Sequence, residues 1–406
     1  MRLDDYIRRG VLFRSALCLA AVVCAVQAAD GPAPSAWNDG CSLQSLHNAD
    51  SLIQSFKSKA KNLGKDGKLR ILIIGDSLSD GGYHWSHYFR KNLQDAYGMG
   101  GFGTIVAGWG KGGAAGWLWD DKKDFACEAA GVWRDSFGGQ GDAWPYLGWN
   151  GRFVCTDSPA AEWKLEAPGS RFTVVYSMGA FKRFTGTWQE TRCAGFAAAL
   201  DADARKIEPA AADQTLDMGL LKFEAPDGKH TLKINAIHDG TFFFHGVLAE
   251  NSAPGVVLYN ISHGGWWAHD FILRQPGWEK ILTEMNPDYT IIFLSKPESG
   301  GTGSPTQTNR NLEFELLTQR VKAALPQTQL LFFQNWSPRD GISRPDLQTC
   351  KDRIAWFEAN HYPYLDLYAG LNSAKMKELG WYADNIHLAQ PGGKGIGDGI
   401  SRLFLP

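Results

Sequence analysis

The chain has 406 residues and a formal net charge of −2 at pH 7. It is longer than one hydrophobic core usually serves, so we expect two domains. A nearly neutral chain lacks the basic surface that nucleic acids require, which argues against a nucleic-acid partner. The 16 tryptophans suit sugar stacking, although most side chains of this kind belong to a core.

The N-terminal residues predict an export signal. Arg8 and Arg9 precede the apolar run 11–26, and a small-residue cleavage site follows at Val26-Gln27-Ala28. We assign residues 1–28 to a signal peptide and the Pro-, Ser- and Asn-rich residues 29–50 to a linker. No later stretch is long and apolar enough to cross a bilayer, so we expect a periplasmic or secreted protein with no transmembrane segment in the mature chain.

The first elements after the linker are a buried strand and a helix. Leu69–Ile74 is apolar without alternation, as in a strand that is covered on both faces. Apolar residues of Trp85–Tyr97 recur at helical spacing, and Gly98 ends the helix. The glycine-rich stretch Gly98–Gly116 predicts a surface loop, without the lysine–serine pair of a phosphate-binding loop.

A long insertion precedes the next buried strand, Val256–Ile261, because the intervening chain exceeds a single crossover. Four further strands are predicted within it, with a turn at Pro226-Asp227-Gly228 between two of them. These strands are Arg171–Ser177, Gly219–Phe223, His230–Ala236 and Phe242–Leu248. We expect residues 125–253 to form a β-sandwich domain inserted into an α/β domain made of residues 51–124 and 254–406.

The C-terminal part again alternates buried strands with helical patterns. The strands are Tyr289–Leu294, Gln329–Gln334 and Tyr364–Leu367. Helical spacing is found at Phe314–Ala324 and around Ile354 and Phe357. This alternation predicts a doubly wound parallel sheet with helices on both faces.

Cysteine usage predicts one disulfide and no metal site. Five cysteines remain after the predicted cleavage, and export permits disulfides. One bridge is plausible among Cys127, Cys155 and Cys193, although the spacing does not say which pair forms it. No group of residues has metal-ligand spacing, and we expect no cofactor.

Polar residues follow the predicted strands at their carboxyl ends, where open α/β sheets place their sites. The first strand ends in Gly-Asp-Ser77-Leu, and Asp384 and His387 follow the last strand. A serine, a histidine and a carboxylate are the parts of a nucleophile–base–orienter triad. We therefore predict Ser77 as nucleophile, His387 as base and Asp384 as orienter. The structural alternatives are a helix-capping serine and a loop histidine beside a capping aspartate.

These residues resemble the blocks of the SGNH (GDSL) hydrolase superfamily. The Gly-Asp-Ser-Leu block, the glycines after the second strand and Asp-x-x-His-Leu near the C-terminus carry the resemblance. More narrowly, Tyr97–Phe102 and Gly246–Leu258 are similar to segments of peptidoglycan O-acetylesterases and polysaccharide O-acetyltransferases that carry a β-sandwich between the first two blocks. The resemblance implies a flavodoxin-like three-layer fold, a carbohydrate-binding-like insert, and an acetylated polysaccharide or cell-wall glycan as partner.

The resemblance also implies an oxyanion hole made by the backbone N–H groups of Ser77 and Gly264, with Gly265 as the competing glycine. The third block departs from the family, because Ser-Lys-Pro stands where an asparagine usually donates its amide. Three interpretations stay open: Lys296 or Ser295 substitutes, Asn335 reaches in from the next strand, or catalysis is weakened.

Tryptophans are candidates for contacts with a glycan. Trp266 follows the glycine block and either lines the acceptor side or packs between domains. The insert contributes four more, Trp144, Trp149, Trp163 and Trp188.

The sequence thus favours an exported serine esterase that removes O-acetyl groups from a cell-envelope or extracellular polysaccharide through an acetyl-serine intermediate. A polysaccharide O-acetyltransferase with the same triad is the first alternative, since the two differ in how the cleft excludes water. A non-catalytic glycan-binding protein is the second, and only the missing third-block asparagine favours it.

Overall fold

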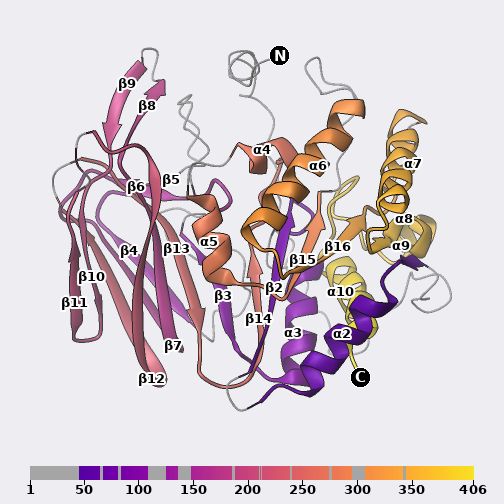
Figure 1. Ribbon diagram of the computed structural model, residues 1–406, viewed down its shortest axis with the longest axis horizontal. Helices are drawn as coiled ribbons and strands as arrows, with labels where there is room; N and C mark the ends of the chain where they lie inside the picture. Colours follow the sequence, from indigo (N-terminus) through magenta and orange to yellow (C-terminus); the bar gives the residue numbers. More distant parts are fainter. Residues whose placement is uncertain are drawn as a thin grey trace.

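The computed structural model describes residues 45–64, 67–80, 84–107, 125–135, 148–184, 188–209, 211, 213–237, 240–273, 277–294, 307–341 and 344–406. Two sheets stand side by side in it, a parallel one and an antiparallel one (Figure 1). The predicted signal peptide, most of the predicted linker, Ser295 and Lys296 lie outside the described residues.

The parallel sheet has the strand order β1-β17-β16-β15-β2-β14. Its strands are β2 (Lys68–Gly75), β14 (Gly255–Asn260), β15 (Tyr289–Phe293), β16 (Gln329–Gln334), β17 (Tyr364–Asp366) and the antiparallel edge strand β1 (Leu46–His47). The five predicted buried strands are confirmed. The part of the predicted linker at β1 belongs to this sheet.

Helices pack in two groups around the parallel sheet. The chain runs from β2 to β14 in one direction, then back past β2 to β15, β16 and β17, so right-handed crossovers place the helices on opposite faces. One group is α2 (Asp50–Lys61), α3 (Trp85–Tyr97) and α10 (Gln390–Phe404), and the other is α4 (Ala268–Ile272), α5 (Trp278–Met285), α6 (Gln307–Ala324) and α7 (Arg344–Ala359). The short helices α8 (Leu367–Gly370) and α9 (Ser373–Glu378) precede the last loop. None of the described helices is long and apolar enough to span a membrane.

The strands between α3 and β14 form a nine-stranded antiparallel sheet and a two-stranded ribbon. The main path is β11-β10-β12-β7-β13-β6-β5, while β4 pairs with β7 and β3 pairs with β13. Their bounds are β3 (Gly101–Val106), β4 (Ala126–Ala130), β5 (Arg134–Asp135), β6 (Val154–Thr156), β7 (Glu162–Met178), β10 (Phe196–Leu200), β11 (Asp203–Ile207), β12 (Asp217–Ala236) and β13 (Phe242–Glu250), with β8 (Ala180–Phe184) and β9 (Trp188–Arg192) in the ribbon. Antiparallel pairing is as expected, and the sandwich packing stays a prediction.

The predicted turn at residues 226–228 is wrong. Both halves of β12 pair with β7, and the register shifts between Glu224 and Gly228. A β-bulge accepts the same residues as a turn, because a proline without an N–H and a glycine both interrupt a strand ladder. The Asp227 carboxylate accepts the Ser252 N–H at 2.8 Å, which holds the bulge against the end of β13.

The predicted surface loop at Gly98–Gly116 is also wrong over the part that the structure describes. Residues 101–106 form β3, in which every residue is buried and which pairs with β13. Thr104 Oγ1 donates to the Asn260 carbonyl oxygen at 3.1 Å, so β3 lies along β14 as well. Gly103 has a φ of +75°, and a Cβ there would overlap the Leu258 carbonyl oxygen. The glycines therefore let β3 approach β14 closely.

The predicted disulfide does not form. Cys127 and Cys193 are free thiols, so no two of the three candidate cysteines are joined. Burial raises the pKa of each of these two thiols to about 12. Both groups therefore stay protonated and unreactive at neutral pH.

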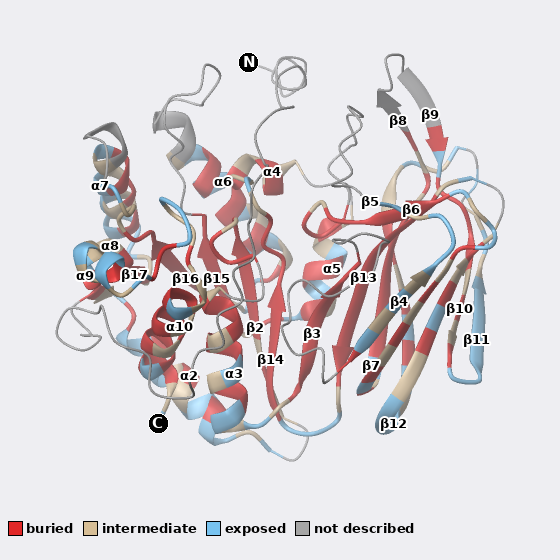
Figure 2. Cartoon of the chain, turned by 180° about the vertical axis from the view of Figure 1, so that it is seen from behind, coloured by how far each residue is buried: buried red, intermediate tan, exposed pale blue. Residues whose placement is uncertain are grey.

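The two sheets share one hydrophobic core. Buried residues run without interruption from the parallel sheet into the antiparallel one (Figure 2). Arg70 on β2 also reaches Glu250 on β13, with Nε–Oε1 and Nη2–Oε2 distances of 2.9 Å each. Burial raises the pKa of Glu250, but this bidentate pair outweighs burial and holds the pKa below its usual value.

The close approach of β3 to β14 predicts the effect of a methyl group at Gly103. We expect Gly103→Ala to lower the free energy of unfolding in urea by at least about 1 kcal/mol more than Gly380→Ala does. Gly380 is the matched control, because its φ of +66° is similar and a Cβ there meets nothing within 4 Å. Equal losses in the two variants would contradict the packing of β3 described above.

Candidate active site

Ser77 lies in a tight turn after β2. A Cβ at Gly75 would lie 2.6 Å from Ser262 Oγ and 2.7 Å from Ser79 Cβ, so only glycine fits there. Asp76 Oδ1 accepts the Leu78 N–H at 2.9 Å, which closes the turn around Ser77. The serine is therefore held at the carboxyl end of a central strand, with its side chain partly exposed.

Asp384 and His387 belong to a second tight turn. The Ala383 N–H donates to the His387 carbonyl oxygen at 2.9 Å and closes the turn. Asp384 Oδ1 accepts the N–H groups of Ile386 and His387, both at 2.8 Å. Burial raises the pKa of Asp384, but these donors and the His387 ring outweigh burial and hold it below its usual value.

The two turns meet in a continuous relay of hydrogen bonds. His387 Nε2 lies 2.8 Å from Ser77 Oγ, and His387 Nδ1 lies 2.6 Å from Asp384 Oδ2. The imidazole thus lies between a hydroxyl and a carboxylate, which is the arrangement that activates a serine. The structure brings together the three residues predicted for the triad.

The loop after β16 supports the histidine turn. Trp336 Nε1 donates to the Ile386 carbonyl oxygen at 3.1 Å, and the Arg339 N–H donates to the Asn385 carbonyl oxygen at 2.7 Å. Asn335 lies at the start of this loop and is 9% exposed. Its Oδ1 is buried and has no hydrogen-bond partner in the described part of the chain. The role of Asn335 as an oxyanion donor stays a prediction.

Gly264 lies beside Ser77, but its N–H already has an acceptor. A Cβ at Gly264 would lie 3.5 Å from Ser77 Cβ. The Gly264 N–H donates to Asp80 Oδ2 at 2.9 Å, so in this conformation it is not open to a substrate oxygen as the sequence predicted. Within the described ranges, the Ser77 N–H makes no hydrogen bond to the backbone, and its role as an oxyanion donor stays a prediction. Gly265 has a φ of +79° in the turn that follows.

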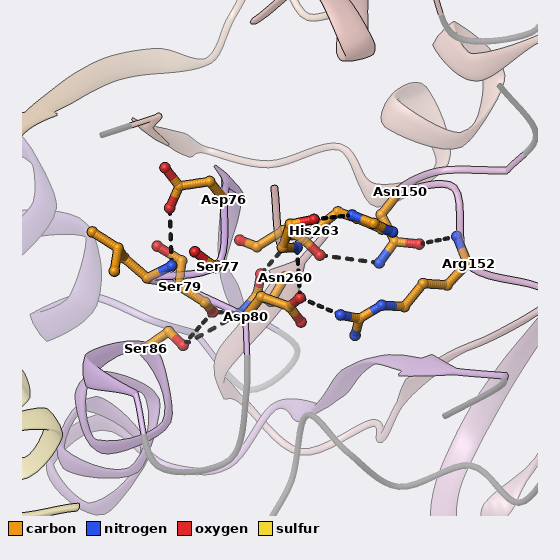
Figure 3. A network of polar contacts seen from close by, with 12 residues as sticks. Asp76, Ser77, Ser79, Asp80, Ser86, Asn150, Arg152, Asn260 and His263 are labelled. Atoms are coloured by element: carbon orange, nitrogen blue, oxygen red, sulfur yellow. Dashed lines mark hydrogen bonds and ion pairs between the residues drawn. The ribbon is translucent and has the colours of Figure 1, made fainter. Parts of the chain in front are cut away.

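Asp80 belongs to a buried polar network that sequence reasoning missed (Figure 3). Its carboxylate forms an ion pair with Arg152, a residue of the inserted segment. Asn260 Nδ2 donates to the Ser79 carbonyl oxygen at 2.8 Å, and Asn150 Nδ2 donates to the Ser262 carbonyl oxygen at 3.2 Å. These contacts brace the serine turn from β14 and from the insert.

Two of the five predicted glycan-contact tryptophans do not line a surface. Trp149 and Trp163 are fully buried, so they belong to the core. Trp144 and the Trp188 side chain lie outside what the structure describes. Trp266 stacks on His263 with 4.2 Å between ring centroids, and it lines a small hollow together with Trp267 and Phe314.

Comparison with solved structures settles the fold. No protein-family model and no curated protein matches the chain. The structure of a peptidoglycan O-acetylesterase superposes with a TM-score of 0.64 and 15% identity, over 86% of this chain and 93% of that chain. The chain has an SGNH hydrolase-like fold.

Two further structures are similar with lower scores. A family two carbohydrate esterase from Clostridium thermocellum gives a TM-score of 0.29 and 10% identity, over 61% of this chain and 93% of that chain. A lipase/acylhydrolase from Enterococcus faecalis gives 0.29 and 17%, over 36% of this chain and 75% of that chain. Scores this low add nothing to the fold assignment, which rests on the first structure, and the activity is argued from the site.

His84 is a second histidine near the relay, and the sequence did not single it out. It precedes α3, and its Nδ1 is buried without a hydrogen-bond partner among the described residues. Burial and, to a smaller extent, the charge of His387 lower the pKa of His84 to about 4. His84 is therefore neutral at pH 7.

The lowered pKa predicts a loss of stability in acid. Between pH 6.5 and about 4 the unfolded chain binds a proton at His84 that the folded chain does not, so the free energy of unfolding falls as the pH falls. We expect His84→Gln to show a smaller shift of the urea midpoint between pH 7 and pH 5 than wild type. His361→Asn, at an exposed histidine, should keep the wild-type shift. An unchanged shift in His84→Gln would contradict the burial of a neutral imidazole.

Proposed function

We propose that the chain is a serine esterase that removes O-acetyl groups from a polysaccharide of the cell envelope or the extracellular space. The observation that carries the proposal is the unbroken relay from Ser77 Oγ through His387 to Asp384. The relay lies at the carboxyl ends of parallel strands in an SGNH hydrolase-like fold. The predicted export signal fits a substrate outside the cytoplasm.

The reaction has two halves that use the same three residues. Ser77 Oγ attacks the acetyl carbonyl carbon while His387 Nε2 takes the hydroxyl proton, and the sugar oxygen leaves with that proton as an alcohol. The product of this half is an acetyl ester of Ser77. In the second half, His387 takes a proton from water, the hydroxide attacks the acetyl-serine, and Ser77 regains a proton as acetate leaves. Asp384 stabilises the imidazolium in both halves.

The substrate class is supported by fold likeness and by the tryptophans that follow the glycine block. The protein with the matching fold is named a peptidoglycan O-acetylesterase. Trp266 and Trp267 directly follow the glycine block and are both half-buried, and indole rings suit contact with sugars. We propose an O-acetylated glycan as the substrate. Cleavage of its ester by the three residues needs no cofactor.

Removal of the Ser77 hydroxyl tests the proposal. Purified wild type should release acetate from at least one of O-acetylated peptidoglycan, acetylated xylan and acetylated alginate. Ser77→Ala should lower that rate by at least about 10³-fold, because it removes the nucleophile. Ser58→Ala is the matched control at an exposed position of α2 and should retain the wild-type rate.

Three results would contradict the proposed esterase. Ser77→Ala with wild-type activity would exclude Ser77 as the nucleophile. Inactivity of wild type on every acetylated glycan would exclude the substrate class. Acetylated oligosaccharide in place of free acetate, detected by mass spectrometry when an acceptor sugar is added, would identify an O-acetyltransferase.

A further inference from the structure

The Gly264 N–H and the Arg152 guanidinium share one acceptor atom. Asp80 Oδ2 takes the Gly264 N–H at 2.9 Å and also the ion pair with Arg152. Asp80 Oδ1 is buried and has no hydrogen-bond partner within the described ranges. The side chains of Asp80 and Arg152 are 3% and 2% exposed, so water does not screen this pair.

Arg152 comes from the inserted segment and is fixed close to the glycine block. Its backbone N–H donates to Asn150 Oδ1 at 3.2 Å. The same Asn150 side chain donates to the carbonyl oxygen of Ser262, two residues before Gly264. The insert therefore holds both Arg152 and the exit of β14 in one hydrogen-bonded unit (Figure 3).

We propose that Arg152 is a positioning residue for the oxyanion hole of the esterase. It holds Asp80 as the acceptor of the Gly264 N–H in the free enzyme, and it keeps the Asp80 charge compensated when this N–H turns to the acyl oxygen in the transition state. This inference rests on the proposed function, because it names a determinant of the same site.

Arg152 determines which partner Asp80 retains when the Gly264 N–H leaves it. The acyl oxygen becomes negatively charged in the transition state and competes with the carboxylate for the N–H. With Arg152 present, Asp80 keeps a charge-assisted partner and the exchange is small in free energy. Without Arg152, release of the N–H would strip a buried carboxylate of its remaining donor among the described residues, which is strongly unfavourable.

Substitution of Arg152 should therefore act on the rate of the chemical step. With 4-nitrophenyl acetate we expect Arg152→Met to lower kcat by about 10²-fold, the usual effect of losing one oxyanion donor, with KM within about threefold of wild type. Arg152→Lys keeps the charge and should stay within about tenfold of the wild-type kcat. It also decides the question if Arg152→Met does not fold.

Arg70→Met is the matched control. It removes the guanidinium of the ion pair between β2 and β13, at Glu250, in which Arg70 is half-buried. The thermal midpoint should fall in both Met variants, but kcat should stay within about threefold of wild type in Arg70→Met. A purely structural role of Arg152 would lower kcat equally in both.

A pH profile gives a second signature that lost stability alone would not produce. Burial raises the pKa of Asp80. Arg152 and the Gly264 N–H lower this pKa, whereas the nearby Asp76 charge raises it. Loss of Arg152 raises this pKa further, so acid neutralises Asp80 and frees the Gly264 N–H. The ratio of kcat in Arg152→Met to kcat in wild type should therefore rise as the pH falls.

The outcomes separate the two proposals. Absence of Ser77-dependent hydrolysis in wild type would overturn the proposed function. Three results would overturn the role of Arg152 alone, provided that wild type shows Ser77-dependent hydrolysis. These results are an unchanged kcat in Arg152→Met, a loss of kcat in Arg152→Lys equal to that in Arg152→Met, and a pH-independent ratio of kcat in Arg152→Met to kcat in wild type.

Discussion

The hydrogen bond between Ser77 Oγ and His387 Nε2 joins residues that are 310 positions apart, and the chemistry of the site depends on it. A serine hydroxyl is a weak nucleophile until a base shares its proton. Gly75 lets the chain turn tightly under Ser77, while Trp336 and Arg339 hold the histidine turn from the loop after β16. The parallel sheet sets the distance between the two turns, because β2 and β16 end at the same edge on either side of β15.

The antiparallel sheet acts as part of this site more than as a separate module. β3 packs along β14, one hydrophobic core crosses both sheets, and the ion pairs Arg70–Glu250 and Arg152–Asp80 join the two parts of the chain. The Arg70–Glu250 pair joins β2 to β13, whereas the Arg152–Asp80 pair joins the insert to the serine turn. Under the proposed role of Arg152, contact at this second junction lets the insert influence catalysis.

Features that depend on local pattern could be predicted from the sequence, and features that depend on tertiary contact could not. Short apolar runs located the five strands, and the Gly-Asp-Ser-Leu and Asp-x-x-His blocks located the residues of the relay. The glycines of β3 resemble those of a loop, since close strand approach and loop freedom both favour glycine. Pro226–Gly228 suits a turn and a bulge equally. The acceptor of the Gly264 N–H could not be predicted from the sequence, because Asp80 and Arg152 meet only in the folded chain.

The central claim is that His387 activates Ser77, and the rate of covalent labelling of Ser77 tests it most directly. Diethyl 4-nitrophenyl phosphate should phosphorylate wild type at one site, which peptide mass spectrometry should assign to Ser77, with activity lost in proportion. The same labelling should be at least about 10²-fold slower in His387→Gln, because the base is gone. Labelling at another residue, or an equal rate in the two proteins, would contradict the account.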